Sequence, residues 1–166
     1  AIFAFQRVVA LTPHNIKAHF NLGNVYQDNG DFEKAIKAYS RLLALKPDYV
    51  EVYNNIGNTL TKLNKYQEAL NFYDKAIQIK PNDIYAHIFK GHVLTELGKL
   101  KESLECYNNA YIINPNHPLL LGYIVHTKTK ICEWENYKVD IQLVKNSLEN
   151  GEKATYPFTT LVIFDS

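Results

Sequence analysis

The sequence predicts an all-α fold, a right-handed superhelical solenoid of helix-turn-helix repeats. The first observation is a 34-residue internal period, marked by Pro13, Pro47, Pro81 and Pro115. The second is that the apolar residues within each period follow helical spacing. Since a fixed period of this size indicates stacked supersecondary units, we expect each repeat to bury its apolar face against its neighbours.

Three further series of residues keep the same period. They are Gly23, Gly57 and Gly91; Ala35, Ala69 and Ser103; and Phe5, Tyr39, Tyr73 and Tyr107. A glycine inside a helix costs about 1 kcal/mol relative to alanine. We therefore expect the glycines to lie where two helix backbones approach closely, with the alanines as the facing small surface. The large tyrosines would then fill the wedge between helices.

The period divides the chain into six segments. They are the second helix of a truncated repeat (1–15), three complete repeats (16–49, 50–83 and 84–117), a divergent capping helical pair (118–150) and a linker or docking tail (151–166). The chain has no methionine and begins inside the repeat pattern. We therefore expect it to be a piece of a longer protein.

Each complete repeat is predicted to hold two helices. The break between them falls at Gly30, Asn64 and Gly98, because glycine and asparagine tolerate the left-handed conformation that ends a helix. Asp31 is expected to cap the second helix of its repeat by accepting from free backbone N–H groups. Pro47 ends that helix, since proline lacks an N–H and disfavours helix at the preceding residue.

These residues resemble the tetratricopeptide repeat (TPR), whose pattern is L-G-x-x-Y…A-x-x-x-Y…P. The matching positions are Leu22, Gly23, Tyr26, Ala35, Tyr39 and Pro47, then Ile56, Gly57, Leu60, Ala69, Tyr73, Ala76 and Pro81, then Gly91, Leu94, Ser103, Tyr107, Ala110 and Pro115. Lys90 departs from the pattern, and we expect its alkyl stem to pack while its ammonium stays in water. The resemblance covers residues 1–117 and implies a module that binds proteins or peptides on its concave face.

The end of the chain carries a second resemblance. It is similar to the junction in SPINDLY/O-GlcNAc-transferase-type glycosyltransferases where the repeats meet the catalytic region. The residues that carry it are His126, Cys132, Glu133, Trp134, Tyr137, Pro157 and Phe158. It implies that the chain is the non-catalytic acceptor-recognition region of a UDP-sugar-dependent protein O-glycosyltransferase, with its catalytic domain downstream. The alternative is a free-standing TPR scaffold for assembling protein complexes.

The composition argues against several other classes. A formal net charge of +1 gives no electrostatic reason to expect nucleic acid or an anionic membrane as partner. Only two cysteines occur, which excludes a disulfide-dense secreted scaffold and favours a reducing, cytoplasmic location. The longest apolar stretch, residues 119–125, is too short to span a bilayer.

No catalytic constellation stands out in the sequence. Metal-ligand spacing is absent, so we expect no metal, no cofactor and no enzyme activity from this chain itself. His19 and His87 share one repeat position and are predicted to pack rather than to ligate. Cys132 has no identifiable neighbouring base, which favours a buried structural cysteine over a reactive thiol.

The candidate peptide-binding residues lie on the first helices, which line the concave side of such a stack. Asn21 and Asn55 share one repeat position, and Asn24 and Asn58 share another, three residues further on the same helix face. An amide donates and accepts, so these side chains could hold the backbone of an extended peptide of any sequence. They resemble the asparagine ladder of O-GlcNAc transferase, and we expect them to be exposed and dispensable for folding.

The third repeat replaces these amides with Phe89 and His92, and the capping pair with Tyr123 and His126. The sequence disfavours a clamp for the acidic tails of heat-shock chaperones, which needs cations at concave positions. Those positions hold Phe20, Tyr85 and Phe89.

Overall fold

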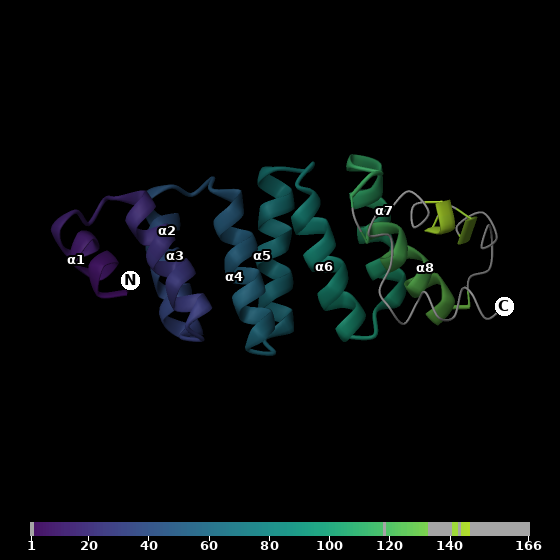
Figure 1. The fold of residues 1–166 in the computed structure, drawn as a ribbon, viewed down its shortest axis with the longest axis horizontal. Helices are drawn as coiled ribbons and strands as arrows, with labels where there is room; N and C mark the ends of the chain where they lie inside the picture. Colours follow the sequence, from purple (N-terminus) through teal and green to yellow (C-terminus); the bar gives the residue numbers. More distant parts are fainter. Residues whose placement is uncertain (1, 118, 133–140, 143, 147–166) are drawn as a thin grey trace. The chain divides into compact units, whose positions relative to one another are not determined.

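The structure is a computed structural model that describes residues 2–117, 119–132, 141–142 and 144–146 (Figure 1). The all-α prediction is confirmed, since the described residues form α helices and no strand. The helices are α1 Ile2–Leu11, α2 Ile16–Asp28, α3 Phe32–Leu45, α4 Val50–Lys62, α5 Tyr66–Ile79, α6 Ile84–Glu96, α7 Leu100–Ile113 and α8 Leu120–Lys130. None of these helices is long and apolar enough to cross a membrane.

The helices belong to two compact units. In the first, Ala1–Pro81, α2 packs on α3 and α4 on α5, while α1 contacts α2 and α3 contacts α4. In the second, Asn82–Ser166, α6 packs on α7 and α7 contacts α8. Each pair is therefore a helical hairpin of the kind that the period predicts.

The repeated glycines lie where a tyrosine ring covers the helix backbone. A Cβ atom on Gly57 would lie 2.5 Å from the Tyr73 ring, and one on Gly91 would lie 2.6 Å from the Tyr107 ring. Gly23 meets Tyr39 in the same way. The predicted close approach is therefore present. The atoms nearest each glycine belong to a tyrosine ring, and the predicted facing position also lies there in the third repeat, where Ser103 Oγ donates to the carbonyl of Gly91 at 2.8 Å.

The breaks between paired helices have the predicted backbone conformation. Gly30, Asn64 and Gly98 have φ of 81°, 58° and 71°, all in the left-handed region. No side chain fills the space where a Cβ on Gly30 or Gly98 would lie, so backbone conformation explains these two glycines.

The expected cap at Asp31 is wrong. Its side chain makes no capping hydrogen bond and lies 3.2 Å from the Lys34 ammonium instead. The backbone at Asp31 has ψ of 62°, whereas the capping residues Asn15 and Asp83 have ψ of 99°. Caps of the expected kind occur at Asn15 and Asp83, which accept from the backbone N–H groups three residues later.

The divergent segment after residue 117 is described only in part. Its first helix is α8, and Val125 of that helix packs against Val144, which lies in a short helical stretch further on. Cys132 is exposed, with φ of 56°, so the prediction of a buried cysteine is wrong. A residue just after a helix end projects into solvent here rather than into the core. The predicted roles of residues 133–140 and of the tail 151–166 lie outside the described residues.

Candidate functional site

In the first unit, helices α2 and α4 bring the predicted amides together. The Nδ2 group of Asn55 donates to Oδ1 of Asn24 at 3.4 Å, which joins neighbouring repeats. Asn21 is exposed, whereas Asn24, Asn55 and Asn58 are half-buried. We call Asn21, Asn24, Asn55 and Asn58 the amide strip.

Two members of the amide strip also support the packing of the second helices. The hydroxyl of Tyr39 donates to Oδ1 of Asn24 at 2.6 Å, and that of Tyr73 donates to Oδ1 of Asn58 at 2.8 Å. Both tyrosines are buried, on α3 and α5. The expectation that all four amides are exposed is therefore wrong for Asn24, Asn55 and Asn58, and the bonds to Tyr39 and Tyr73 give Asn24 and Asn58 a role in packing. A buried hydroxyl needs an acceptor, and the amide oxygen supplies it.

The tyrosine hydroxyls keep their protons at neutral pH. Burial raises the pKa of Tyr39 above its ordinary range, although hydrogen bonding to Asn55 opposes the shift. Burial raises the pKa of Tyr73 to about 12, with hydrogen bonding to Thr61 as the opposing effect. Both hydroxyls therefore remain donors, and the amide oxygens of Asn24 and Asn58 remain committed to them.

The remaining hydrogen-bonding capacity of the amide strip is mainly that of donors. Within the described part of the chain, the Nδ2 groups of Asn24 and Asn58 and the whole side chain of Asn21 have no hydrogen-bond partner. An amide nitrogen carries two N–H donors. The strip is thus suited to groups that accept hydrogen bonds, among which peptide carbonyls are the most common in an extended chain.

A further position of the repeat takes part in the same network. Gln27 Oε1 lies 3.1 Å from the Tyr39 hydroxyl and 3.1 Å from Thr59 Oγ1. Thr61 holds the same position one period later and lies 3.4 Å from the Tyr73 hydroxyl. Thr95 holds it two periods later and lies 3.4 Å from the Tyr107 hydroxyl. This position was not among the predicted site residues. Its signal is a polar residue at the same place in every repeat.

In the second unit, aromatic rings replace the amides. His92 on α6 makes edge contacts with Tyr107, at 5.7 Å between ring centroids, and with Tyr123, at 4.6 Å. The two tyrosine rings stack at 5.4 Å. Phe89 and His92, which were predicted as a pair, have different roles. Phe89 packs against the apolar cluster around Leu104 and Leu120 instead of joining these rings.

These rings line a cavity of about 280 Å³, together with His126, Thr95 and Lys130. Burial lowers the pKa of His92, and burial together with Lys130 lowers the pKa of His126. Both imidazoles are therefore neutral at physiological pH. This part of the second unit is an aromatic surface whose charged lining residues are Glu96 and Lys130.

The other histidines singled out from the sequence are packing residues, as predicted. His19 and His87 are buried. Nε2 of His19 lies 2.8 Å from the carbonyl of Pro13, and at the same repeat position the Tyr53 hydroxyl donates to the carbonyl of Pro47 at 2.9 Å. In the portion of the chain that the structure describes, no three His, Cys, Asp or Glu residues group as a metal site.

Comparison with known proteins identifies the repeat. Family models described as tetratricopeptide repeat match residues 15–82 and 84–117, together more than half of the chain. The chain belongs to the TPR family. It is a TPR module, a class of domain whose general role is to bind proteins and peptides.

Solved TPR structures share this fold. A crystal structure of MamA matches with a TM-score of 0.79 at 20% identity and covers 89% of each chain. MamA 41-end from Desulfovibrio magneticus RS-1 matches with a TM-score of 0.76 at 16% identity, covering 89% of this chain and 82% of that one. At these identities the likeness establishes the TPR solenoid fold alone.

YrrB, whose structure is titled as that of a TPR protein with an unusual peptide-binding site, matches with a TM-score of 0.68 at 20% identity. The match covers 85% of this chain and 73% of YrrB. No curated protein matches the chain significantly in sequence. Nothing in these comparisons supports the resemblance to a glycosyltransferase junction.

Proposed function

We propose that the amide strip binds an extended peptide through its main chain. The observation that carries this proposal is the contact between Asn55 and Asn24, because it makes the strip continuous across two repeats. A peptide long enough to extend from one repeat to the next can then meet donors on both α2 and α4. Each repeat that the peptide crosses therefore adds to the binding free energy. The strip makes no demand on peptide side chains, so the proposed selectivity is for extended backbone rather than for sequence.

The chemistry of the strip favours peptide carbonyls. Tyr39 and Tyr73 occupy the amide oxygens of Asn24 and Asn58, which leaves N–H groups pointing away from those bonds. Carbonyls on one side of an extended chain recur roughly every 7 Å. Residues three apart on a helix rise by about 4.5 Å, so a peptide that crosses the helix axes obliquely can place successive carbonyls against the strip.

The most economical context for this activity is a scaffold that assembles protein complexes. The rival context, an acceptor-recognition arm with a catalytic domain downstream, depends on residues 133–158, most of which lie outside the described residues. It stays a prediction without support. Both contexts use the same peptide-binding surface, so the test below applies to either.

The decisive variant is Asn24→Asp combined with Asn58→Asp. Aspartate has the shape of asparagine and keeps an oxygen that accepts from Tyr39 or Tyr73, but it has no N–H to donate. We expect the double variant to fold. We expect its affinity for a peptide main chain to fall at least about ten-fold, since two donors are replaced by charges that repel carbonyl oxygens.

Isothermal titration with two acetylated and amidated octapeptides of Ser, Thr, Val, Ala and Gln in unrelated orders measures this effect. The matched control is Asn71→Asp with Asn82→Asp, which adds the same charge at exposed positions away from the strip. The proposal predicts that the control binds both peptides like the unchanged chain. It is contradicted if the unchanged chain binds neither peptide, or if the strip variant binds both as well as the control does.

A further inference from the structure

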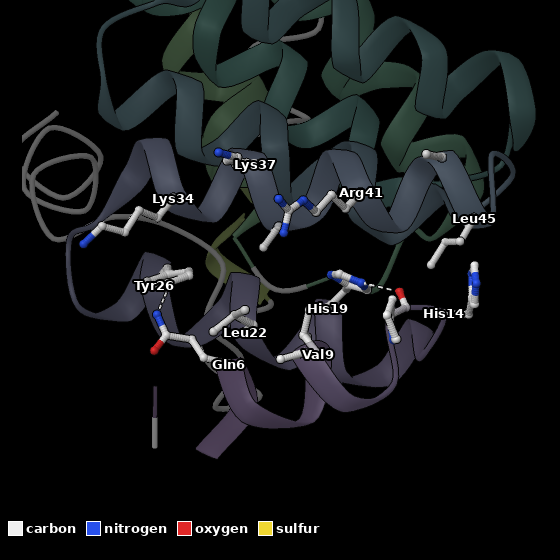
Figure 2. A pocket seen from close by; sticks show the side chains of 14 residues that line it. Gln6, Val9, His14, His19, Leu22, Tyr26, Lys34, Lys37, Arg41 and Leu45 are labelled. Atoms are coloured by element: carbon white, nitrogen blue, oxygen red, sulfur yellow. Dashed lines mark hydrogen bonds between the residues drawn. The ribbon is translucent and has the colours of Figure 1, made fainter. Parts of the chain in front are cut away.

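The first unit has a cavity of its own, whose lining residues do not include the amide strip. It is lined by residues of α1, α2 and α3 and has a volume of about 710 Å³ (Figure 2). Val9 of α1 and Leu22 of α2 give it an apolar floor. This volume is within the roughly 300–1,000 Å³ typical of ligand sites.

The charges that line this cavity are all positive. Lys34, Lys37 and Arg41 follow one face of α3, and no aspartate or glutamate is among the described residues that line the cavity. Lys34 is partly neutralised by Asp31, at 3.2 Å. Lys37 and Arg41 are exposed and make no ion pair with any described residue.

The next repeat shows why the cavity exists. Where the first repeat has Ala38 and His19, the second repeat has Phe72 and Tyr53, whose ring centroids lie 6.3 Å apart. Two large rings thus occupy the place that an alanine and an imidazole leave open.

The positive row is also confined to the first repeat. One period after Lys34, Lys37 and Arg41 stand Glu68, Asn71 and Lys75. Two periods after them stand Glu102, Glu105 and Asn109. Open volume and positive charge therefore depart from the repeat pattern at the same place.

A buried imidazole lies at the edge of the cavity. His19 is 3% exposed and lines the cavity, and its Nε2 must donate to the carbonyl of Pro13, because a carbonyl only accepts. Its other ring nitrogen, Nδ1, is buried and has no hydrogen-bond partner within the described residues. In neutral His19 this Nδ1 is an acceptor. Because this nitrogen is enclosed by the protein, His19 packs at the edge of the cavity, and the ligand is defined by the cations and the apolar lining.

We infer that this cavity binds an acidic peptide segment of a partner protein, with alternating acidic and apolar side chains. Lys34 and Arg41 are seven residues apart, about 10 Å along the helix. A single small anion cannot span this row, whereas acidic side chains two residues apart in an extended peptide are separated by roughly 7 Å. Carboxylates would pair with Lys37 and Arg41, and the apolar side chain between them would lie on Val9 and Leu22.

The test uses the full 166-residue chain and the acetylated, amidated pentapeptide Glu-Leu-Glu-Leu-Glu carrying a fluorescent label. Lys37→Gln with Arg41→Gln removes the unpaired cations at exposed positions and should leave the fold intact. Ala38→Phe fills the cavity with the residue that the second repeat has there. We expect each variant to lower the affinity for the pentapeptide at least about ten-fold by fluorescence anisotropy, since charge-assisted bonds or the space for them are lost.

The matched control is Lys65→Gln with Lys75→Gln, which removes the same charge from elsewhere in the first unit and should bind like the unchanged chain. The peptide Gln-Leu-Gln-Leu-Gln should bind far more weakly, and added salt should weaken binding of the acidic peptide. Equal loss in the control variant, unchanged affinity in Lys37→Gln with Arg41→Gln, or no binding by the unchanged chain would overturn the inference. Displacement of the peptide by inorganic phosphate at equal concentration would also overturn it in favour of a simple anion site.

This inference is independent of the proposed function. The neutral octapeptides that probe the amide strip carry no charge for Lys37 and Arg41. The substitution of Asn24 and Asn58 by aspartate leaves the lining of the cavity unchanged. If one proposal fails, the other is therefore still tested by its own binding measurement.

Discussion

The first and second complete repeats, residues 16–49 and 50–83, share one packing scheme and differ in how they fill it. In both, a tyrosine ring lies on a glycine and donates its hydroxyl to an asparagine. Only the second repeat then fills the space beside its first helix with a phenylalanine, Phe72, whereas the first has Ala38 and a cavity.

This difference shows that residues which follow the period and residues which break it have different roles. Positions that recur in every repeat, such as Gly57 and Tyr73, build the hairpin. Positions that break the period, such as Ala38 and Lys37, create surfaces that only one repeat has. A departure that leaves the packing intact is therefore the place to look for a binding site in a repeat protein.

The shared scheme is most directly broken by Gly57→Leu. A leucine side chain cannot occupy space where even a Cβ would lie 2.5 Å from the Tyr73 ring, so the ring must leave its site. We expect the free energy of unfolding to fall by about 3 kcal/mol or more, since overpacking is costly and burial of Tyr73 is also lost. Urea denaturation measures the loss. A variant that unfolds at the same urea concentration as the unchanged chain would contradict the packing described here.

Comparing Asn58→Ala with Asn21→Ala separates an amide that supports packing from one that is only exposed. It leaves the buried hydroxyl of Tyr73 without its close acceptor, so we expect a loss of about 2 kcal/mol in unfolding free energy. Asn21→Ala, at an exposed position of the same strip, should change stability by less than about 0.5 kcal/mol. Thermal melts of the two variants side by side check this order. Equal melting temperatures would show that the hydroxyl does not depend on Asn58.

The raised pKa of Tyr73 predicts a loss of stability in alkali. The pKa is about 12 in the folded chain, against 10.0 for an ordinary tyrosine. The folded state disfavours the phenolate. The stability that the neutral Tyr73 hydroxyl contributes is therefore fully present below pH 10 and is lost as the pH rises through 12. The stability difference between the unchanged chain and Tyr73→Phe should therefore shrink by about 2 kcal/mol from pH 9 to pH 12. A difference that stays constant over this range would show that Tyr73 titrates normally.

The contrast between the two repeats is sharpened by placing the second repeat's residues in the first. Ala38→Phe with His19→Tyr should fill the cavity, and His19→Tyr should keep the bond to the Pro13 carbonyl, as Tyr53 does with Pro47. We expect unfolding free energy to rise by about 1 kcal/mol, as is common when a cavity is filled. Guanidinium denaturation checks the sign. A clear loss of stability would show that the two repeats are packed differently around this position.

Much of the fold could be predicted from the sequence because it depends on local and periodic signals. The helices, the left-handed residues Asn64 and Gly98, and the close approach at Gly57 all follow from residue types at fixed spacing. The absence of a capping bond at Asp31 could not be predicted, because it goes with a backbone conformation before α3 that differs from the one at Asn15 and Asp83.

The sequence predicts which residues form the amide strip but not which hydrogen bonds they make. The register of Asn24 and Asn58 follows from the period, yet their bonds to Tyr39 and Tyr73 depend on how the second helix packs on the first. The same holds for the cavity beside Ala38, since a small residue in a periodic pattern does not reveal whether a neighbour fills its space.

The central claim is that the amide nitrogens of the strip hold a peptide backbone, and side-chain NMR tests it most directly. In a ¹⁵N-labelled chain, the side-chain NH₂ signals of Asn21, Asn24 and Asn58 can be assigned by single substitutions to aspartate. We predict that both neutral octapeptides shift these signals in a saturable way, while the signal of Asn71, on an exposed face of α5, stays in place. Saturable binding that leaves the three strip signals unmoved, or that moves them with only one of the two peptides, would contradict the claim.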